Sequence, residues 1–432
     1  MSDVETHRRG GSPEPALPKP VQPAGDDAAG WRRNLAALMA ASFIGFAGFT
    51  LVMPFLPLYI AQMGERDIGA IASWTGVSLG VTPAITAILA PVWGRLADRV
   101  GRRFLVARSL VSFIVIMGAM AYVTHPWQLV ALRAVQGLFA GYGALCLAMA
   151  ADSAPKERVA QSIGLVQTAQ RLGPAVGPVL GGVVAGLVGL SSAFLVTAGF
   201  YAVALVLLLV LYREPRTLHH ETASRQASRV TFRSVLAFEN FLLLMVVIFG
   251  FQFVDRSLGP VLPLYVAALG VPSADVPLLS GLVFSVLACG AALGHHFGAR
   301  LMLRRTARAL ISRAALAAAL AIALFAVVGG PWTLAAAACL FGIAVGAAMT
   351  AAYTAAASVM PFSLRGAGFG LLTSASLAGV AVSPMISGFI AATDMRVVFA
   401  ADALVLCLLA LSVRRVMVDT PAAAEAPTRE DA

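Results

Sequence analysis

Twelve long apolar blocks dominate this sequence, and they limit its possible folds more than any other feature does. Each block is close to the ~20 residues that an α-helix needs to cross the hydrocarbon core of a membrane. Of the 432 residues, 59% are hydrophobic and 12% are charged, whereas a soluble protein carries roughly twice that charged fraction. The sequence therefore predicts an all-α integral membrane protein with twelve transmembrane helices. The expected spans cover residues 34–62, 70–93, 104–123, 127–151, 160–187, 191–211, 237–268, 275–297, 308–328, 331–358, 366–391 and 396–416.

Basic residues gather in alternate connections between these blocks. The connection after the second block, residues 94–103, contains four arginines and one aspartate, and further arginines follow in every second connection. The other connections are short and nearly free of positive charge. Because arginine-rich loops stay on the cytoplasmic side, we expect a multi-pass protein with both termini in the cytoplasm. This topology accounts for the net charge of +10 without a nucleic-acid partner.

The chain consists of two similar halves. Residues 53–60 match residues 259–266, and residues 155–182 align without gaps to residues 361–388, at an offset of about 206 residues. Six spans per half make both halves cross the membrane in the same direction, an arrangement typical of transporters that bind substrate between the halves near the midplane. The expected units are a disordered cytoplasmic tail (1–30), an N-terminal six-helix half (31–211), a cytoplasmic linker (212–236), a C-terminal six-helix half (237–417) and a second disordered cytoplasmic tail (418–432).

Several motifs resemble one family. The run 94–103 resembles the signature loop between spans 2 and 3 of the major facilitator superfamily, and Arg133-Ala-Val-Gln-Gly resembles its span-4 motif. Residues 173–182 resemble the span-5 motif of proton-coupled exporters, and residues 31–35 with 51–59 are similar to the start of the bacterial drug:proton antiporter-1 group. The resemblance covers about residues 31–417. It implies the major facilitator fold and the bacterial cytoplasmic (inner) membrane.

The loop at 94–103 has a physical role of its own. Asp98 lies near the start of span 3, where unpaired N–H groups favour an anion. Glycines on either side of Asp98 allow a close approach of the backbone. The resemblance implies that this loop is a conformational latch between the halves, and the alternative is a charge that only sets topology. The expected latch residues are Gly94, Asp98, Arg99, Gly101, Arg102, Arg103 and Asp152.

Span 5 carries small residues at helical spacing. Gly173, Gly177 and Gly181 recur every fourth residue and therefore share one helix face, which lets transmembrane helices pack closely. With Pro178 and Gly182 they form the predicted span-5 packing motif. A packing face without a coupling role is the alternative, and the resemblance to exporters favours a tight contact that prevents leak.

Charged residues inside spans are the best candidates for proton coupling or substrate binding, because their burial in a membrane is costly. They are Arg133, Arg171, Asp255 and Arg256. The resemblance implies a coupling role for Arg133. We interpret Asp255 as the carboxylate that carries the proton, and the alternative is a structural pair with Arg256 or Arg171. Asp402 in span 12 is the next candidate. The alternative for Asp402 is a position near the outer interface.

No pattern in the sequence indicates catalysis. We find no catalytic residues, metal site or nucleotide-binding loop, so we expect no enzyme activity and no cofactor other than a proton gradient as energy source. His295 and His296 lack neighbouring carboxylates or cysteines, and we interpret them as an interfacial anchor. The four cysteines lie inside apolar blocks without a CxxC pair and are expected to be inert packing residues.

The function that fits these features best is proton-coupled export of small amphiphilic compounds or drugs by alternating access. The expected partners are a small-molecule substrate, protons and membrane lipids, and we expect a monomer. A proton-coupled importer of nutrients or metabolites with the same fold is the first alternative. A non-transporting membrane sensor is the second, although it would require a sizeable soluble domain. The identity of the substrate stays open, since fold does not fix function.

Overall fold

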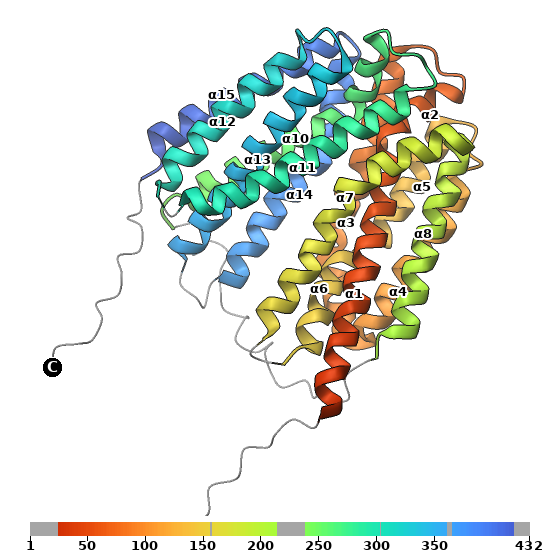
Figure 1. Cartoon of the computed structure of the whole chain (residues 1–432), viewed down its shortest axis with the longest axis vertical. Helices are drawn as coiled ribbons and strands as arrows, with labels where there is room; N and C mark the ends of the chain where they lie inside the picture. The colour runs from red at the N-terminus through yellow and green to blue at the C-terminus, as the bar shows by residue number, and fades with distance from the viewer. Residues whose placement is uncertain (1–24, 156–157, 214–237, 303, 361–364, 419–432) are drawn as a thin grey trace, which may run out of the picture.

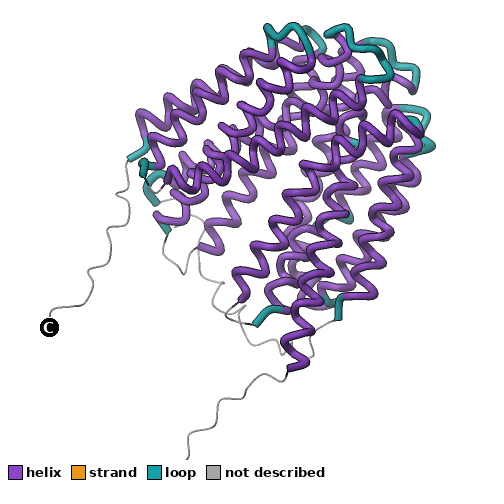
Figure 2. The backbone as a smooth tube through the Cα atoms, viewed as in Figure 1, coloured by secondary structure: helices purple, strands orange, loops and turns teal. Residues whose placement is uncertain are grey.

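The computed structural model describes residues 25–155, 158–213, 238–302, 304–360 and 365–418, and within these ranges the secondary structure is helical (Figures 1 and 2). The N-terminal elements are α1 (Gly25–Leu51), the 3-10 turn η1 (Met53–Phe55), α2 (Leu56–Gln62), α3 (Ile68–Val100), α4 (Arg102–Met120), α5 (Pro126–Leu138), α6 (Tyr142–Ser153), α7 (Val159–Val188) and α8 (Leu190–Leu211). The C-terminal elements are α10 (Phe241–Ala268), α11 (Val276–Met302), α12 (Ala307–Phe325), α13 (Pro331–Val359), α14 (Arg365–Ala391) and α15 (Met395–Val416).

The described residues form 12 helical segments that are long and apolar enough to cross a membrane. This confirms the predicted all-α membrane class and the number of spans. The expected N-terminal tail is wrong in its extent, because α1 already begins at Gly25. The rest of that tail, nearly all of the expected linker and the tail beyond Val418 lie outside the described residues.

Two spans of the N-terminal half are interrupted, although the sequence predicted continuous helices. In span 1, the turn η1 separates α1 from α2, where Pro54 and Pro57 lack the N–H groups that a continuous helix uses. In span 4, α5 ends at Leu138 and α6 starts at Tyr142. Between them Gly141 has a φ of 116°, a backbone conformation that favours glycine. The two repeats therefore differ in backbone where their sequences still correspond.

The same tyrosine contact is present in each half. The hydroxyl of Tyr59 donates to the carbonyl oxygen of Met120 at 2.7 Å, and that of Tyr265 donates to Phe325 O at 2.6 Å. Both tyrosines are buried in the hydrophobic core. A hydroxyl buried in an apolar interior needs such a partner. The internal repeat is thus present in the hydrogen bonds of the two halves as well as in their sequence.

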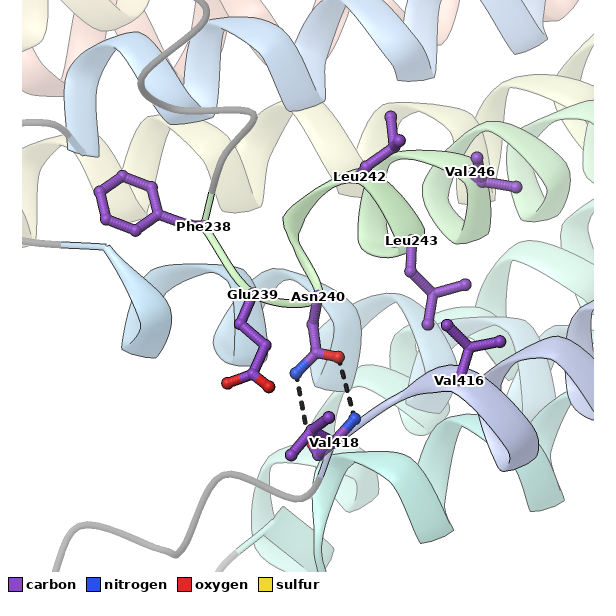
Figure 3. A pocket seen from close by; sticks show the side chains of 8 residues that line it. All are labelled: Phe238, Glu239, Asn240, Leu242, Leu243, Val246, Val416 and Val418. Atoms are coloured by element: carbon purple, nitrogen blue, oxygen red, sulfur yellow. Dashed lines mark hydrogen bonds between the residues drawn. The ribbon is translucent and has the colours of Figure 1, made fainter.

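An asparagine joins the first and last helix of each half. Asn34 in α1 donates to Arg213 O at 2.7 Å and accepts from Arg213 N at 2.9 Å. In the C-terminal half, Asn240 exchanges hydrogen bonds of 3.0 and 2.9 Å with the backbone of Val418 (Figure 3). A mostly apolar surface pocket of about 500 Å³ lies beside this second pair. We call these two contacts the asparagine clasps, and each one closes its six-helix half.

The two halves lie side by side as separate helical bundles (Figure 1). They meet where α3 packs on α14 and where α7 packs on α11. The described chain starts with α1 and ends after α15, and these two ends lie on the same side of the molecule, which we call the terminal end (Figure 1). The opposite side, with the loop between α2 and α3, is the distal end. The halves come together at the distal end and diverge toward the terminal end (Figure 1).

Candidate functional site

The contact between the halves at the distal end is made by glycines. A side chain at Gly76 of α3 would overlap the carbonyl oxygen of Pro384 in α14, and one at Gly281 of α11 would overlap that of Pro178 in α7. A methyl group at Gly182 would lie 2.7 Å from a carbonyl oxygen of α11. Helices with small residues approach backbone to backbone in this way. Two members of the predicted span-5 motif, Pro178 and Gly182, thus lie at the boundary between the halves.

The other members of that motif face α1 in the same half. A methyl group at Gly173 would lie 2.7 Å from Ala47 N, and one at Gly177 would lie 2.5 Å from Ala47 O. One at Gly181 would overlap the carbonyl oxygen of Leu51. The predicted glycine face is therefore a close contact between α7 and α1. Whether it also prevents leak stays a prediction.

Toward the terminal end, α7 and α14 each carry a glycine that contacts no neighbouring helix. Gly164 in α7 and Gly370 in α14 occupy corresponding positions of the two repeats, and each has open space where a side chain would be. Their counterparts further along, Gly173 and Gly379, are both tightly packed. Gly164 and Gly370 are thus on exposed faces of their helices, whereas Gly173 packs against α1 and Gly379 against α10 of the same half.

A hydrogen-bonded chain crosses between the halves near the middle of α7. The guanidinium Nη1 of Arg171 lies 2.9 Å from His295 Nε2 of α11, and His295 Nδ1 lies 2.8 Å from the hydroxyl of Thr350 in α13. That hydroxyl lies 3.1 Å from the carbonyl oxygen of Gly346. Arginine has only donors, so Nε2 must accept, Nδ1 must carry the hydrogen, and Thr350 must donate to a backbone carbonyl oxygen, of which Gly346 O is the nearer. The geometry thus fixes a neutral His295 with one tautomer.

This contact corrects the interpretation of the two histidines. His295 is half-buried and bonded across the halves, so it is not an interfacial anchor. His296 is exposed and its ring contacts Phe297 at 5.8 Å between centroids. The sequence could not reveal the pairing, because Arg171 and His295 lie in different repeats. No group of three or more His, Cys, Asp or Glu residues that could hold a metal ion is found in the described part of the chain.

Arg133 lies in the interior of the N-terminal half. It is 1% exposed, and its Nη1 reaches Gln136 Oε1 at 3.5 Å. Its Nε and Nη2 atoms and the hydroxyl of Tyr201 are buried without a hydrogen-bond partner in the described part of the chain. A buried cation without an acidic partner is costly and marks a functional position in membrane proteins. Its predicted coupling role fits this placement and remains a prediction.

The two acidic candidates have different surroundings. Asp255 is ion-paired with Arg256 at 3.3 Å, and its side chain is 18% exposed. This is one of the structural pairs considered for it. Asp402 is 2% exposed and accepts a short hydrogen bond from the Ser257 hydroxyl. It is therefore buried between α15 and α10 and not at an outer interface.

The predicted latch is described in part. Arg102 forms an ion pair with Asp152 at 2.5 Å, which joins α4 to the end of α6, and Arg103 donates to Leu209 O at 2.9 Å. Gly101 separates α3 from α4 with a φ of 91°, and Arg99 is exposed. The side chains of the remaining latch residues, Gly94 and Asp98, lie outside the described part of the chain.

Further polar and aromatic contacts lie on α10, α13 and α14 and were missed by sequence reasoning. Gln252 donates to the Ser376 hydroxyl at 2.8 Å. The rings of Tyr353 and Phe369 are stacked with centroids 6.4 Å apart. Their amide and hydroxyl groups inside otherwise apolar spans are the sequence feature that could have indicated them, since such groups need a partner in a membrane.

Comparison with known proteins agrees with this architecture. The sequence profile of the Major Facilitator Superfamily matches residues 38–334 and 307–432. Multidrug resistance protein MdtG from Serratia proteamaculans (strain 568) is 32% identical over 256 residues, and the chain spans 62% of that relative's length and 59% of its own. Multidrug resistance protein MdtG from Salmonella heidelberg (strain SL476) is 30% identical over 379 residues, which cover 86% of this chain and 92% of that protein.

A solved structure is similar over nearly the whole chain. It is a bacterial homolog to human lysosomal transporter Spinster in an inward-facing and occupied conformation, with a TM-score of 0.74 and 17% identity, covering 90% of this chain and 98% of that one. At this identity the likeness shows the fold. The architecture defines a multi-pass membrane protein made of two six-helix halves. The chain belongs to the Major Facilitator Superfamily, as the recognition from its motifs predicted.

Proposed function

We propose that this chain is a secondary active transporter that exports small amphiphilic compounds or drugs in exchange for protons. The observation that carries the proposal is the arrangement of the halves, which are in close contact at Gly76 and Gly281 near the distal end and diverge toward the terminal end (Figure 1). A site between two such halves is accessible from one side at a time, and rocking of the halves exposes it to the other. The relatives named multidrug resistance proteins support export over import of a nutrient.

The proposed orientation follows from the arginines. The terminal end carries exposed arginines in the described loops and helix ends, among them Arg99, Arg304 and Arg415. By the positive-inside rule this end faces the cytoplasm of a bacterial inner membrane. The conformation is then open to the cytoplasm. A fluorescent protein fused after residue 432 that fluoresces only in the cytoplasm tests this orientation; an absent signal from a fully expressed fusion would contradict it.

Asp255 is the proposed carrier of the proton. A carboxylate that exchanges protons must be reached by water, and Asp255 is partly exposed while Asp402 is buried. Arg256 beside it provides a counter-charge for the deprotonated form. Arg133 and Arg171 are the charged residues of the N-terminal half that are proposed to take part in proton coupling or substrate binding. We propose further that the chain acts as a monomer, without catalysis or a cofactor, and draws its energy from the proton gradient.

The latch residues are proposed to stabilise the other conformation, in which the terminal end closes. In the open state Arg102 is engaged with Asp152 within the N-terminal half. Movement of the halves would let the arginines of this loop exchange partners at little cost, since each partner is near the surface.

Susceptibility of cells tests the direction of transport. Expression of the chain in a drug-sensitive bacterium is expected to raise the inhibitory concentration of several amphiphilic compounds. If expression instead restores growth on a carbon source and leaves drug susceptibility unchanged, the chain is an importer and the proposal is wrong.

A further inference from the structure

A groove of about 670 Å³ lies between α12 and α15, at the outer side of the C-terminal half. Three arginines line it, Arg308, Arg313 and Arg414, and its lining includes no acidic residue. The walls between them are apolar and include Leu316 and Leu411. The groove therefore combines positive charge with an apolar surface, on two helices that pack beside each other (Figure 1).

The groove is ordered along the direction of the membrane normal. Arg308 lies in the first turn of α12 and Arg414 in the last turn of α15, so both are at the terminal end, where the membrane boundary falls. Leu316 lies ~12 Å further along α12, at 1.5 Å per residue. Leu316 and Leu411 are 49% and 43% exposed, and they continue the groove toward the hydrocarbon core. Charge is thus at the boundary and apolar surface is below it.

Arg313 needs an anion that the described protein does not supply. It is exposed and lies inside the span Ala307–Phe325. No ion pair or hydrogen bond joins its side chain to any other described residue. A charge at this depth is costly unless the side chain extends to the interface and meets a counter-charge. The depth of Arg313 places that counter-charge at the level of lipid phosphates.

The other half shows what the same positions look like without a groove. Arg108 occupies the position that corresponds to Arg313, and its guanidinium lies 3.8 Å from the ring centre of Trp93. Phe104 stands where the C-terminal half has Ala309, and Leu209 stands where it has Arg414. The C-terminal half therefore has space and an additional charge where the N-terminal half has an aromatic ring and an apolar side chain.

We propose that the groove between α12 and α15 binds an anionic phospholipid of the leaflet at the terminal end. Its phosphate lies among Arg308, Arg313 and Arg414, and an acyl chain follows Leu316 and Leu411. A free phosphate compound would use the arginines and gain nothing from the apolar wall, whereas a phospholipid uses both. The site depends on the membrane-spanning fold alone, so its test is independent of whether the chain exports drugs.

Native mass spectrometry of the full chain in detergent tests the proposal, with palmitoyl-oleoyl phosphatidylglycerol and phosphatidylcholine as probes at equal concentration. We expect at least tenfold preferential retention of phosphatidylglycerol. Arg313→Gln and Arg414→Gln should each weaken its binding about fivefold, the usual contribution of one basic residue near anionic lipid. Ala309→Phe, which introduces the residue of the other half and keeps every charge, should weaken it at least as much.

Arg415→Gln is the matched control, because Arg415 is exposed beside Arg414 and does not line the groove. It should leave phosphatidylglycerol binding unchanged. Equal loss of phosphatidylglycerol binding in Arg415→Gln and Arg313→Gln would show a diffuse electrostatic attraction and overturn the site. Full phosphatidylglycerol binding in both Ala309→Phe and Arg313→Gln would also overturn it. Competition by glycerol 1-phosphate at the concentration of the lipid would overturn the choice of a phospholipid. Melting temperatures without lipid verify that each variant is folded.

Discussion

At the scale of residues, polar side chains in this protein are placed by partners far away in the sequence. Arg171 finds His295 in the other half, and Asp402 accepts from Ser257 on a different helix. In a membrane, every polar group needs such a partner, since no water replaces it. The type of a residue therefore indicates that a partner is favourable, and the fold decides which residue provides it.

Asp255 and Asp402 provide a pair of variants that separates coupling from stability. Asp255→Asn keeps the shape of the side chain but cannot release a proton, so we expect proton-driven efflux to fall to the level of vesicles without the protein. Asp402→Asn should retain efflux, because Asp402 is buried between α10 and α15. Transport assays on both purified variants provide the measurement. Full efflux in Asp255→Asn, or loss of efflux in Asp402→Asn alone, would contradict the assignment to Asp255 and indicate that Asp402 carries the proton.

The asparagine clasps predict an order of stabilities. Asn34→Ala removes two hydrogen bonds to the backbone of Arg213 at a site that is 5% exposed, so the free energy of unfolding should fall by about 1–3 kcal/mol. Asn240→Gly, which keeps the φ of 63° without strain, should cost less, because its contact with Val418 is solvent-exposed. Reversible unfolding in mixed micelles gives both values, and the opposite order would contradict the assignment.

At the scale of elements, the sequence predicted the helices well and their interruptions poorly. Apolar length identifies a span because the membrane has a fixed thickness. The break at η1 was not predictable from proline alone, since Pro260 and Pro263 lie inside the continuous helix α10 at corresponding positions. The glycine face of α7 was predictable because its spacing is local. That Gly182 and Pro178 meet α11 depends on the assembly of the two halves.

The face of α7 can be tested with two glycines of the same helix. Gly177→Ala would place a methyl group 2.5 Å from Ala47 O, and such overpacking typically costs 1–3 kcal/mol. Gly186→Ala is the control, because nothing lies within 4 Å of its side-chain position. It should leave the protein unchanged or stabilise it by up to about 1 kcal/mol. Similar melting temperatures for the two variants would show that α7 and α1 are not in close contact.

At the scale of the whole molecule, two similar bundles meet closely at one end and separate at the other. The repeat in the sequence predicted the two halves, and the structure adds which end is closed. The conformation depends on weak contacts between the halves, as glycine surfaces lack charged pairs that would fix one state. The hydrogen bond between Arg171 and His295 joins the halves, so we expect it to influence the equilibrium between the two conformations.

Spin labels can report this balance. His295→Leu removes the acceptor of Arg171, so a larger fraction of molecules should separate at the distal end. Labels at the exposed residues Arg66 and Thr393, in distal loops of the two halves, should then show a longer distance. His295→Gln, which retains an acceptor, is the control and should stay near the wild type. Identical distance distributions in all three proteins would show that the contact does not hold the halves together.

Transport in everted membrane vesicles with an imposed pH gradient tests the central claim most directly. An everted vesicle turns the cytoplasmic side outward, so an exporter accumulates its substrate inside. With an acidic lumen, we expect accumulation of an amphiphilic dye that a protonophore abolishes and that Asp255→Asn vesicles do not show. Accumulation that is the same with and without the gradient, or movement of the dye in the opposite direction, would contradict proton-driven export.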